Sequence, residues 1–225
     1  MQRIKCALFI LFVSLSLGLS GCATESARAL TPQQVQSAKA PYSGPKSSLV
    51  VGKFDNRSNF MRGLFSDGVD RLGSQAKTIL MTHLQQANRF QVMDRTNMAE
   101  LKEESALSGK AQQLKGAAFV ITGDVTEFGR KETGDMQLFG ILGRGKTQVA
   151  YAKVNLNVVD ITTSEVVFSV QGAGEYALSN REIAGFGGTA SYDSTLNGKV
   201  LDLAVREAVN RLVDGMDQGA WTPAR

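Results

Sequence analysis

The sequence predicts a mixed α/β (α+β) fold, in which a small mixed β-sheet is flanked by helices in the order β-α-β-α-β-β-β-α. Two patterns carry this prediction. Apolar and polar residues alternate over 147–160, as they do in a half-buried strand. Apolar residues recur at helical spacing over 74–87 and 197–216. With 225 residues and 43% apolar content, the chain can form one domain with a buried core.

The first half of the domain is predicted to alternate strand and helix. A helix over 97–107 begins at Asn97, which has capping-box spacing to Glu100, and ends at Gly109. The helix over 74–87 has an apolar face. The remaining elements of this half are strands over 47–54, 89–94 and 117–128, and a short helical turn at 111–114.

The second half is predicted to contain two long strands and a closing helix. The strands cover 147–160 and 165–176 and are joined by the turn "DITTSE". The helix over 197–216 has one apolar face, formed by Leu201, Ala204, Val205, Ala208, Leu212 and Met216.

The N-terminus has the features of a secretory signal peptide over residues 1–21, with Arg3 and Lys5 before an apolar run. It closes with Leu19-Ser20-Gly21-Cys22, which resembles the bacterial lipobox. This resemblance implies cleavage before Cys22, lipid on its sulfur and acylation of its amino group. Ala23 in place of Asp after the cysteine implies release to the outer membrane.

Cleavage would also remove one of the two cysteines, Cys6, while Cys22 carries lipid. No disulfide, metal site or thiol nucleophile is then expected in the mature protein. Loss of two basic residues lowers the formal charge from +4 to +2. This makes a nucleic-acid partner unexpected. Residues 22–46 are predicted to be a lipidated N-terminus and flexible tether of roughly 25–30 Å, followed by one domain over 47–222.

The stretch "GILGRGKT" over 140–147 matches the phosphate-binding loop pattern G-x-x-x-x-G-K-[ST]. A working loop of this kind needs a helix after it, because the helix N-terminus holds the phosphates. Here the residues after Thr147 alternate with period two and predict a strand. Asp160 is too close in sequence to allow a helix and a return strand. We therefore expect no nucleotide binding.

Catalytic candidates are weak. His83 is the only histidine and lies within a predicted helix. The paired carboxylates Glu103 and Glu104 lie on a charged helix surface, and Asp202 and Glu207 are assigned to the solvated side of the last helix. We expect no enzyme activity, cofactor or metal site.

Five segments taken together resemble the CsgG/HfaB family of outer-membrane lipoproteins, which serve curli and holdfast export. They are "VGKFDNRS", "RFQVMDRTNMAELKEE", "GAAFVITGDVTEF", "VNLNVVDITTSEVVFSV" and "AVREAVNRLVDGMDQGAW", in that order between residues 51 and 221. The resemblance implies a periplasmic α/β domain whose copies associate side by side into a ring. In channel members, two hairpin extensions of each subunit together close one outer-membrane barrel.

The matching extensions here are 129–148 and 173–192. Each places charges beside an apolar, glycine-rich tip. Arg130 and Glu132 share a strand face with Met136, whereas Lys131 and Asp135 fall on the other. Three outcomes stay open: full spanning in an oligomeric barrel, partial insertion or subunit contact, and plain exposed loops. The candidate tip residues are Met136, Leu138, Phe139, Ile141, Leu142, Ile183 and Phe186.

Channel members narrow the pore with a loop whose counterpart here is 56–73. This chain has Gly63, Asp67 and Gly68 near the expected positions, so the constriction is not carried over. Phe60 and Phe65 are candidate replacements, or they pack beneath the loop.

The resemblance implies an oligomeric outer-membrane lipoprotein that supports export or assembly of a surface structure, as a passive channel. Expected partners are further copies of the chain, outer-membrane lipid, secreted surface subunits and accessory lipoproteins. The alternative is a non-channel periplasmic binding module, similar to LpoB-like activators of cell-envelope enzymes. The long tether and charged extensions favour this second hypothesis.

Overall fold

The computed structural model describes residues 31–60, 70–137, 143–182 and 195–222. The chain divides into two compact units, Met1–Gln33 and Gln34–Arg225, and nearly all described residues belong to the second. The predicted element order is confirmed, with one added 3-10 helix. The elements are η1 (Gln36–Lys39), β1 (Ser47–Asn56), α2 (Arg71–Gln86), β2 (Phe90–Met93), α3 (Met98–Leu107), β3 (Phe119–Gln137), β4 (Gly143–Asp160), β5 (Val166–Glu182) and α4 (Leu196–Asp217).

The strands form one five-stranded mixed sheet in the order β2-β1-β3-β4-β5. β1 pairs in parallel with β2 and β3, whereas β3–β4 and β4–β5 are antiparallel. The parallel pairs are connected through α2 and α3, and the antiparallel strands follow one another directly along the chain. This is the predicted mixed α/β class.

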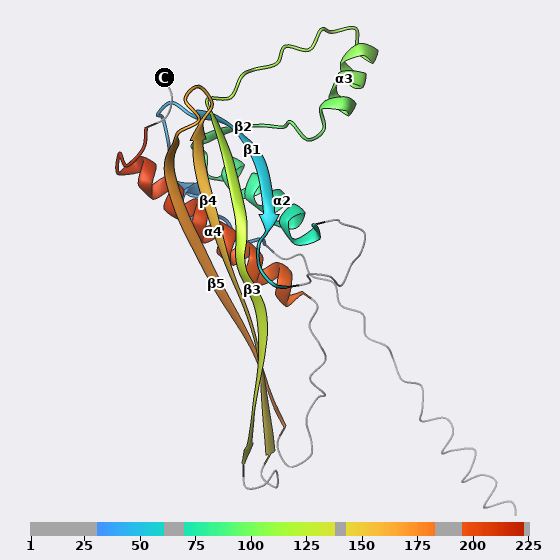
Figure 1. Cartoon of the computed structure of the whole chain (residues 1–225), viewed down its shortest axis with the longest axis vertical. Helices are drawn as coiled ribbons and strands as arrows, with labels where there is room; N and C mark the ends of the chain where they lie inside the picture. Colours follow the sequence, from blue (N-terminus) through green and yellow to red (C-terminus); the bar gives the residue numbers. More distant parts are fainter. Residues whose placement is uncertain (1–30, 61–69, 138–142, 183–194, 223–225) are drawn as a thin grey trace, which may run out of the picture. The chain divides into compact units, whose positions relative to one another are not determined.

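Helices α2 and α4 pack on one face of the sheet (Figure 1). They bury it because alternate strand residues point toward the helices. In β4 the alternating residues that were predicted to face the core are all buried, from Ala150 to Val158. Trp221 closes one end of this core, where it stacks on Phe90 and Phe168 and meets Phe119 edge-on. The other face of β3–β5 carries polar residues.

Helix α2 begins at Arg71, three residues earlier than predicted. The reason is Asp70, whose side chain accepts a hydrogen bond from the Gly73 backbone N–H at 2.7 Å. The same carboxylate accepts a second bond from the Asn56 backbone N–H. Gly73 has to be small, because a Cβ there would collide with the Asp70 carboxylate and the Phe54 carbonyl. Asp70 therefore joins the helix start to the end of β1.

Two predictions near α3 are wrong. Asn97 precedes the helix but makes no side-chain capping bond, and its side-chain amide donates to the Asp94 carboxylate at 2.6 Å. The predicted turn at 111–114 is not helical. Gly109 does follow the helix end, with a positive φ of 67° that suits glycine.

The compact unit begins at Gln34, so residues 34–46 belong to it together with the predicted domain. Val35 is buried, and the Gln36 backbone N–H donates to Asn210 of α4 at 2.9 Å. Farther along this segment, the Arg89 guanidinium lies 4.0 Å from the ring centre of Tyr42. Isolated apolar residues in a polar stretch therefore hold the segment against the domain.

The glycine-rich segment leads into a strand, as predicted. Residues 143–147 and those after them belong to β4, whose backbone is extended to Asp160. No helix follows Thr147, so the helix N-terminus that a phosphate-binding loop requires is missing there. Residues 140–142 lie outside the described residues.

His83 is buried and joins the two large helices. Its Nε2 lies 2.9 Å from Oδ1 of Asp202 in α4, and its Nδ1 lies 3.3 Å from Oε1 of Gln86. The assignment of Asp202 to a purely solvated face is therefore incomplete, since it contacts a buried partner on α2. His83 is a packed histidine.

Candidate functional site

The candidate site is the part of β3, β4 and β5 that continues past the rest of the sheet; we call it the extension. β1 stops pairing with β3 at Asn56↔Val125, whereas β3 and β4 stay paired to Gln137↔Gly143. β5 remains paired with β4 to Arg144↔Glu182. The extension therefore comprises β3 from Glu127, β4 up to Lys153 and β5 from Ala173. In Figure 1 these strands run downward past the start of α4.

The first turns of α4 brace the base of the extension. The Arg130 guanidinium donates to the Asn197 side-chain oxygen at 2.8 Å. Tyr176 of β5 lies in the same row of the sheet as Arg130. The ammonium of Lys199, in α4, lies 5.2 Å from the Tyr176 ring centre. Gln148, two rows farther out, is still buried. The start of α4 therefore fixes the position from which the three strands project.

Farther along α4, glycines in β5 let the helix approach the sheet closely. A Cβ on Gly172 would collide with the backbone of Ala204 and Ala208, and one on Gly174 would press against Leu203. Both alanines are fully buried. Because both surfaces are small, helix and strand approach within backbone contact, which gives the extension a rigid root.

The opposite face of the sheet is polar and carries cross-strand pairs. Gln171 donates to Asn155 at 2.8 Å, and the Lys153 ammonium lies 2.6 Å from the Glu127 carboxylate. At the base of the extension this face is hollowed by about 600 Å³, with Tyr151 in its lining. Such pairs stabilise a sheet modestly while keeping its surface solvated.

Near the end of β1, one arginine pairs with two carboxylates. The Arg57 guanidinium donates to Asp124 at 3.1 Å and lies 3.3 Å from Asp55. The hydrogen bond to Asp124, followed by the attraction of both carboxylates, raises the pKa of Arg57 above its ordinary value. At the far end of the sheet, the pKa of Asp160 is lowered because Thr162 and Thr163 donate hydrogen bonds to it. Neither arrangement resembles an acid–base site.

Opposite charges share rows in the outer extension. The register puts Asp135, Gly145 and Arg181 in one row. It puts Arg144 between Met136 and Glu182 in the next. The charged stems predicted from sequence therefore belong to paired strands rather than to an irregular loop.

The predicted functional residues fall into two groups. Met136 lies in β3, and Phe60 packs on Phe128 with ring centres 4.7 Å apart. The second group lies outside the described residues: Cys22, Phe65, Leu138, Phe139, Ile141, Leu142, Ile183 and Phe186.

Within the described ranges, no helix has the length and apolar character needed to cross a membrane. Over the same residues, His, Cys, Asp and Glu side chains do not gather in threes at any place that would hold a metal ion.

The sequence did not predict the contact between Arg130 of β3 and Asn197 of α4. Arg130 and Asn197 are 67 positions apart, so no local pattern links them. One signal was present: Gly172 and Gly174 interrupt a strand while Ala204 and Ala208 lie on the apolar face of the last helix. Small residues in both elements indicate a close helix–sheet approach.

The described architecture defines a class of protein: a mixed sheet with two helices on one face and three strands that project past them. The model of the family described as "Curli production assembly/transport component CsgG" matches residues 28–224. The chain therefore belongs to the CsgG family, as the sequence predicted.

A particular relative sharpens this assignment. The chain is 65% identical over 216 residues to "Putative lipoprotein NMB1126/NMB1164" of Neisseria meningitidis serogroup B, covering 96% of this chain and 97% of the relative. This supports the prediction that the chain is a lipoprotein. Neither name describes an enzyme.

Two solved structures show weaker likeness. The PelC dodecamer of Paraburkholderia phytofirmans matches with a TM-score of 0.32 and 12% identity, covering 75% of this chain and 93% of that one. The LpoB C-terminal domain of Salmonella enterica matches with a TM-score of 0.31 and 14% identity, covering 56% and 81%. Both TM-scores are low, so neither likeness informs function.

Proposed function

We propose that this CsgG-family lipoprotein is anchored to the outer membrane through lipid on Cys22, oligomerises, and supports export or assembly of a cell-surface structure. The extension would form or border a passive opening. Family membership and the lipobox support the location. No step in this function requires nucleotide hydrolysis or a cofactor.

The observation that carries the proposal is the pair of open strand edges. Among the described residues, β3 from Glu127 onward and β5 along its length have no strand partner on their outer sides. An exposed edge presents N–H and C=O groups to another strand. Neighbouring copies in a ring would satisfy these groups, and a closed barrel removes edges altogether.

The directions of the strands determine how many strands each copy would contribute to such a barrel. β3 and β5 are both antiparallel to β4, so they run in the same direction. Direct β5-to-β3 pairing between copies would be parallel, whereas membrane barrels are built from antiparallel strands. Each copy would therefore need one more strand, and the predicted second extension to residue 192 supplies the required sequence.

The length of the strands limits how far the extension could reach into a membrane. Past Arg130, β3 continues for about seven residues, or roughly 23 Å. A spanning strand needs about 9–11 residues. Full spanning would thus also need tip residues from 138–142, including Leu138 and Phe139. Charges such as Asp135 and Arg181 would then face the lumen or lie near the headgroups.

The test is single-channel conductance of the purified, lipidated chain in planar bilayers. We expect discrete large pores. Deleting 133–145 should abolish them, because the strands are then too short to span. Replacing Lys146-Thr147 by Asn-Gly in the same variant leaves a two-residue turn between Glu132 and Gln148, which are already register partners.

Thr163→Ala is the control, since this residue lies in the turn at the opposite end of the sheet. It should conduct like the parent. If the parent gives no pores and stays monomeric in detergent, the channel proposal is wrong. If pores persist in the deletion, the extension does not form the opening. Cys22→Ala tests the anchor separately, because it should release the protein from membranes.

The alternative is a periplasmic binding module. The polar, uncovered face of the sheet favours it, since the hollow near Tyr151 and Lys153 offers hydrogen-bonding groups. In that case a monomeric, non-conducting chain would be expected.

A further inference from the structure

Helix α3 is the least packed element of the domain. None of its residues is buried, and it forms a lobe together with the segment 109–114 that follows it. The side chains of three leucines in this lobe are exposed: Leu101 by 42%, Leu107 by 76% and Leu114 by 57%. Leu114 lines a groove of the lobe and Leu107 does not, so the lobe exposes apolar side chains on more than one side.

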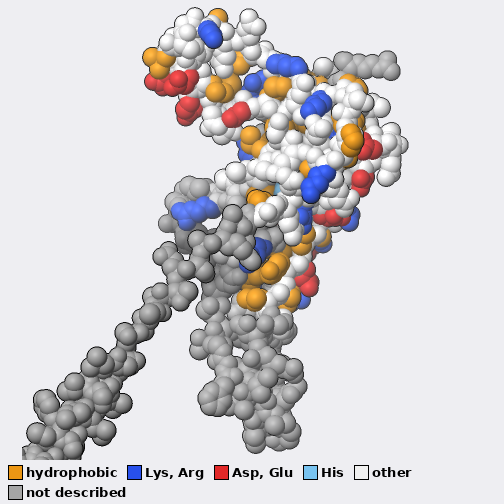
Figure 2. Space-filling model, turned by 180° about the vertical axis from the view of Figure 1, so that it is seen from behind, with side chains coloured by type: hydrophobic (Ala, Val, Ile, Leu, Met, Phe, Trp, Pro, Cys, Tyr) orange, Lys and Arg blue, Asp and Glu red, His pale blue; other side chains and the backbone are white. Residues whose placement is uncertain are grey.

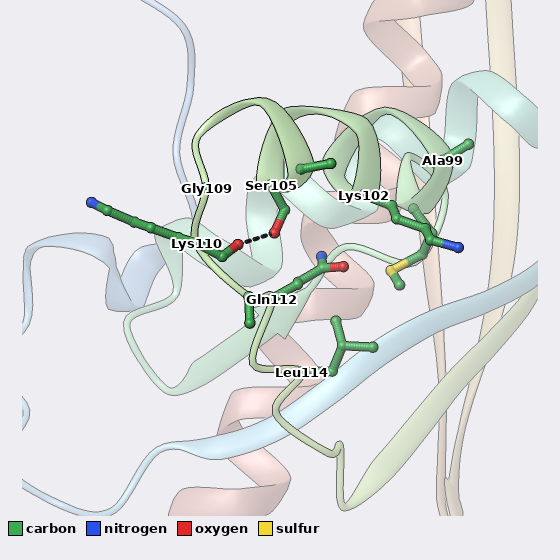
Figure 3. A pocket seen from close by; sticks show the side chains of 10 residues that line it. Ala99, Lys102, Ser105, Gly109, Lys110, Gln112 and Leu114 are labelled. Atoms are coloured by element: carbon green, nitrogen blue, oxygen red, sulfur yellow. Dashed lines mark hydrogen bonds between the residues drawn. The ribbon is translucent and has the colours of Figure 1, made fainter.

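One side of the lobe is an apolar groove of about 730 Å³ between α3 and the following segment. Met98, Ala106 and Leu114 contribute apolar surface to it, and Figure 3 shows Leu114 beside the helix. Lys102 and Lys110 lie at its two ends and point outward in different directions. No acidic residue is among the residues that line this groove. The groove is therefore apolar and basic.

The other side of α3 has the opposite charge. Residues three and four apart share a helix face, so Glu100, Glu104 and Leu107 form one stripe, with Glu103 beside it. All four are exposed, and none of them lines the groove. Figure 2 shows acidic and hydrophobic side chains close together on this lobe. The outer stripe is therefore apolar and acidic.

We propose that the groove of one copy receives the outer α3 stripe of a second copy of this chain. The apolar residues of one surface would cover those of the other, while Lys102 and Lys110 meet Glu100 and Glu104. The two surfaces differ, so the contact is heterologous and repeats from copy to copy. This inference rests on the proposed oligomerisation and names the surface that would link neighbours.

The geometry of the lobe suits such a contact. The lobe is held at its root, where Arg95 donates to the Lys115 carbonyl and Lys115 bonds Gln91. Ser105 donates to the Lys110 carbonyl, which ties the two walls of the groove together. The groove is therefore a formed feature, and its occupant does not have to open it.

Charge reversal on each surface tests the contact by sedimentation of the full, lipidated chain in detergent. Lys102→Glu with Lys110→Glu reverses the groove. Glu100→Lys with Glu104→Lys reverses the stripe. Each pair should weaken self-association about tenfold, because attraction becomes repulsion at two positions. All four residues are exposed, so folding should be unaffected.

An equimolar mixture of the two variants should regain association, because each groove then meets a stripe of opposite charge. A chain carrying all four reversals should do the same. Glu165→Lys with Asp214→Lys is the matched control at exposed acids away from α3 and should associate like the parent. Failure of the mixture to recover, or unchanged association of both variants, overturns the proposal.

A second measurement uses a short thiol cross-linker on two separately tagged variants, Leu107→Cys and Gln112→Cys. Cross-linked pairs should form only when the two are mixed. Pairs formed by Leu107→Cys alone would mean a symmetric contact, and a cross-link to another protein in cells would mean a different occupant. Either result overturns the proposal. A parent that forms conducting rings while both reversals leave them intact would refute this contact and leave the proposed function standing.

Discussion

Helices α3 and α4 both contain leucines, but the two helices differ in how far these side chains are buried. α4 packs across β4 and β5, and its leucines Leu201 and Leu212 are fully buried. α3 also contains leucines, yet Leu107 is 76% exposed. The difference lies in the elements around them: α4 lies on the sheet and α3 leads away from it (Figure 1). Apolar content alone therefore does not show whether a helix builds the core or offers a contact.

Because the two helices are packed differently, substitutions in them should have different effects. In α4 a change alters packing that supports the strands of the extension. In α3 a change alters a surface that lies away from the core. Stability should therefore depend on α4, and association on α3.

The largest expected effect separates the two helices directly. Leu212→Ala should lower the free energy of unfolding by about 2–5 kcal/mol, because it removes a fully buried side chain and leaves a cavity. Leu107→Ala should change it by less than about 0.5 kcal/mol. Urea unfolding followed by circular dichroism measures both. Equal losses would contradict the distinction.

The next effect concerns the close approach of α4 to the sheet. Gly172→Val should destabilise the protein by about 1–3 kcal/mol, because its side chain would push against the backbone of Ala204 and Ala208. Gly116→Val is the control, since a Cβ there has no neighbour within 4 Å. Thermal unfolding compares them. A tolerated valine at 172 would mean that the helix can shift away from β5.

A smaller effect concerns how helices begin. Asp70→Ala should lower the free energy of unfolding by about 1 kcal/mol, because it removes the α2 cap and a bond to the end of β1. Asn97→Ala should change the free energy of unfolding less, since Asn97 makes no capping bond to α3. Denaturant titration of both variants checks the order. A larger loss at Asn97 would be inconsistent with the structure.

The smallest expected effect is a change in the pKa of Asp94, which lies just before α3. Hydrogen bonds from the Asn97 side chain, and then from the Thr96 backbone, lower the pKa of Asp94 below its ordinary value of 3.8. A lowered pKa means that this stabilisation is present above pH 3.8 and disappears as the pH falls through the lowered pKa. Carbon-detected NMR titration should show the pKa of Asp94 rising in Asn97→Ala. An unchanged value would show that Asn97 is not the cause.

Much of the fold was predictable because its signals are local. Alternation over 147–160 identified β4, and it also excluded a phosphate-binding loop, since the backbone after Thr147 is extended. Apolar spacing identified α2 and α4 within a few residues. Ordered family segments predicted the CsgG family, which the family match confirms.

Other features were not predictable because they depend on distant partners. The segment before β1 was assigned to a flexible tether, yet Val35 is buried and Gln36 bonds Asn210, 174 positions away. The α2 start is capped by Asp70, whose carboxylate also accepts a bond from Asn56, 14 positions away. In each case the stabilising group lies outside any sequence window.

The sequence by itself determined the element order, the family and the charged stems of the extension, because periodicity and segment order are properties of neighbouring residues. Only the tertiary structure decided that α4 braces the strands through Arg130 and Asn197. It also decided that α3 keeps its leucines on the surface. Burial depends on which elements meet in space, and contact between residues far apart in the chain leaves no periodic trace along it.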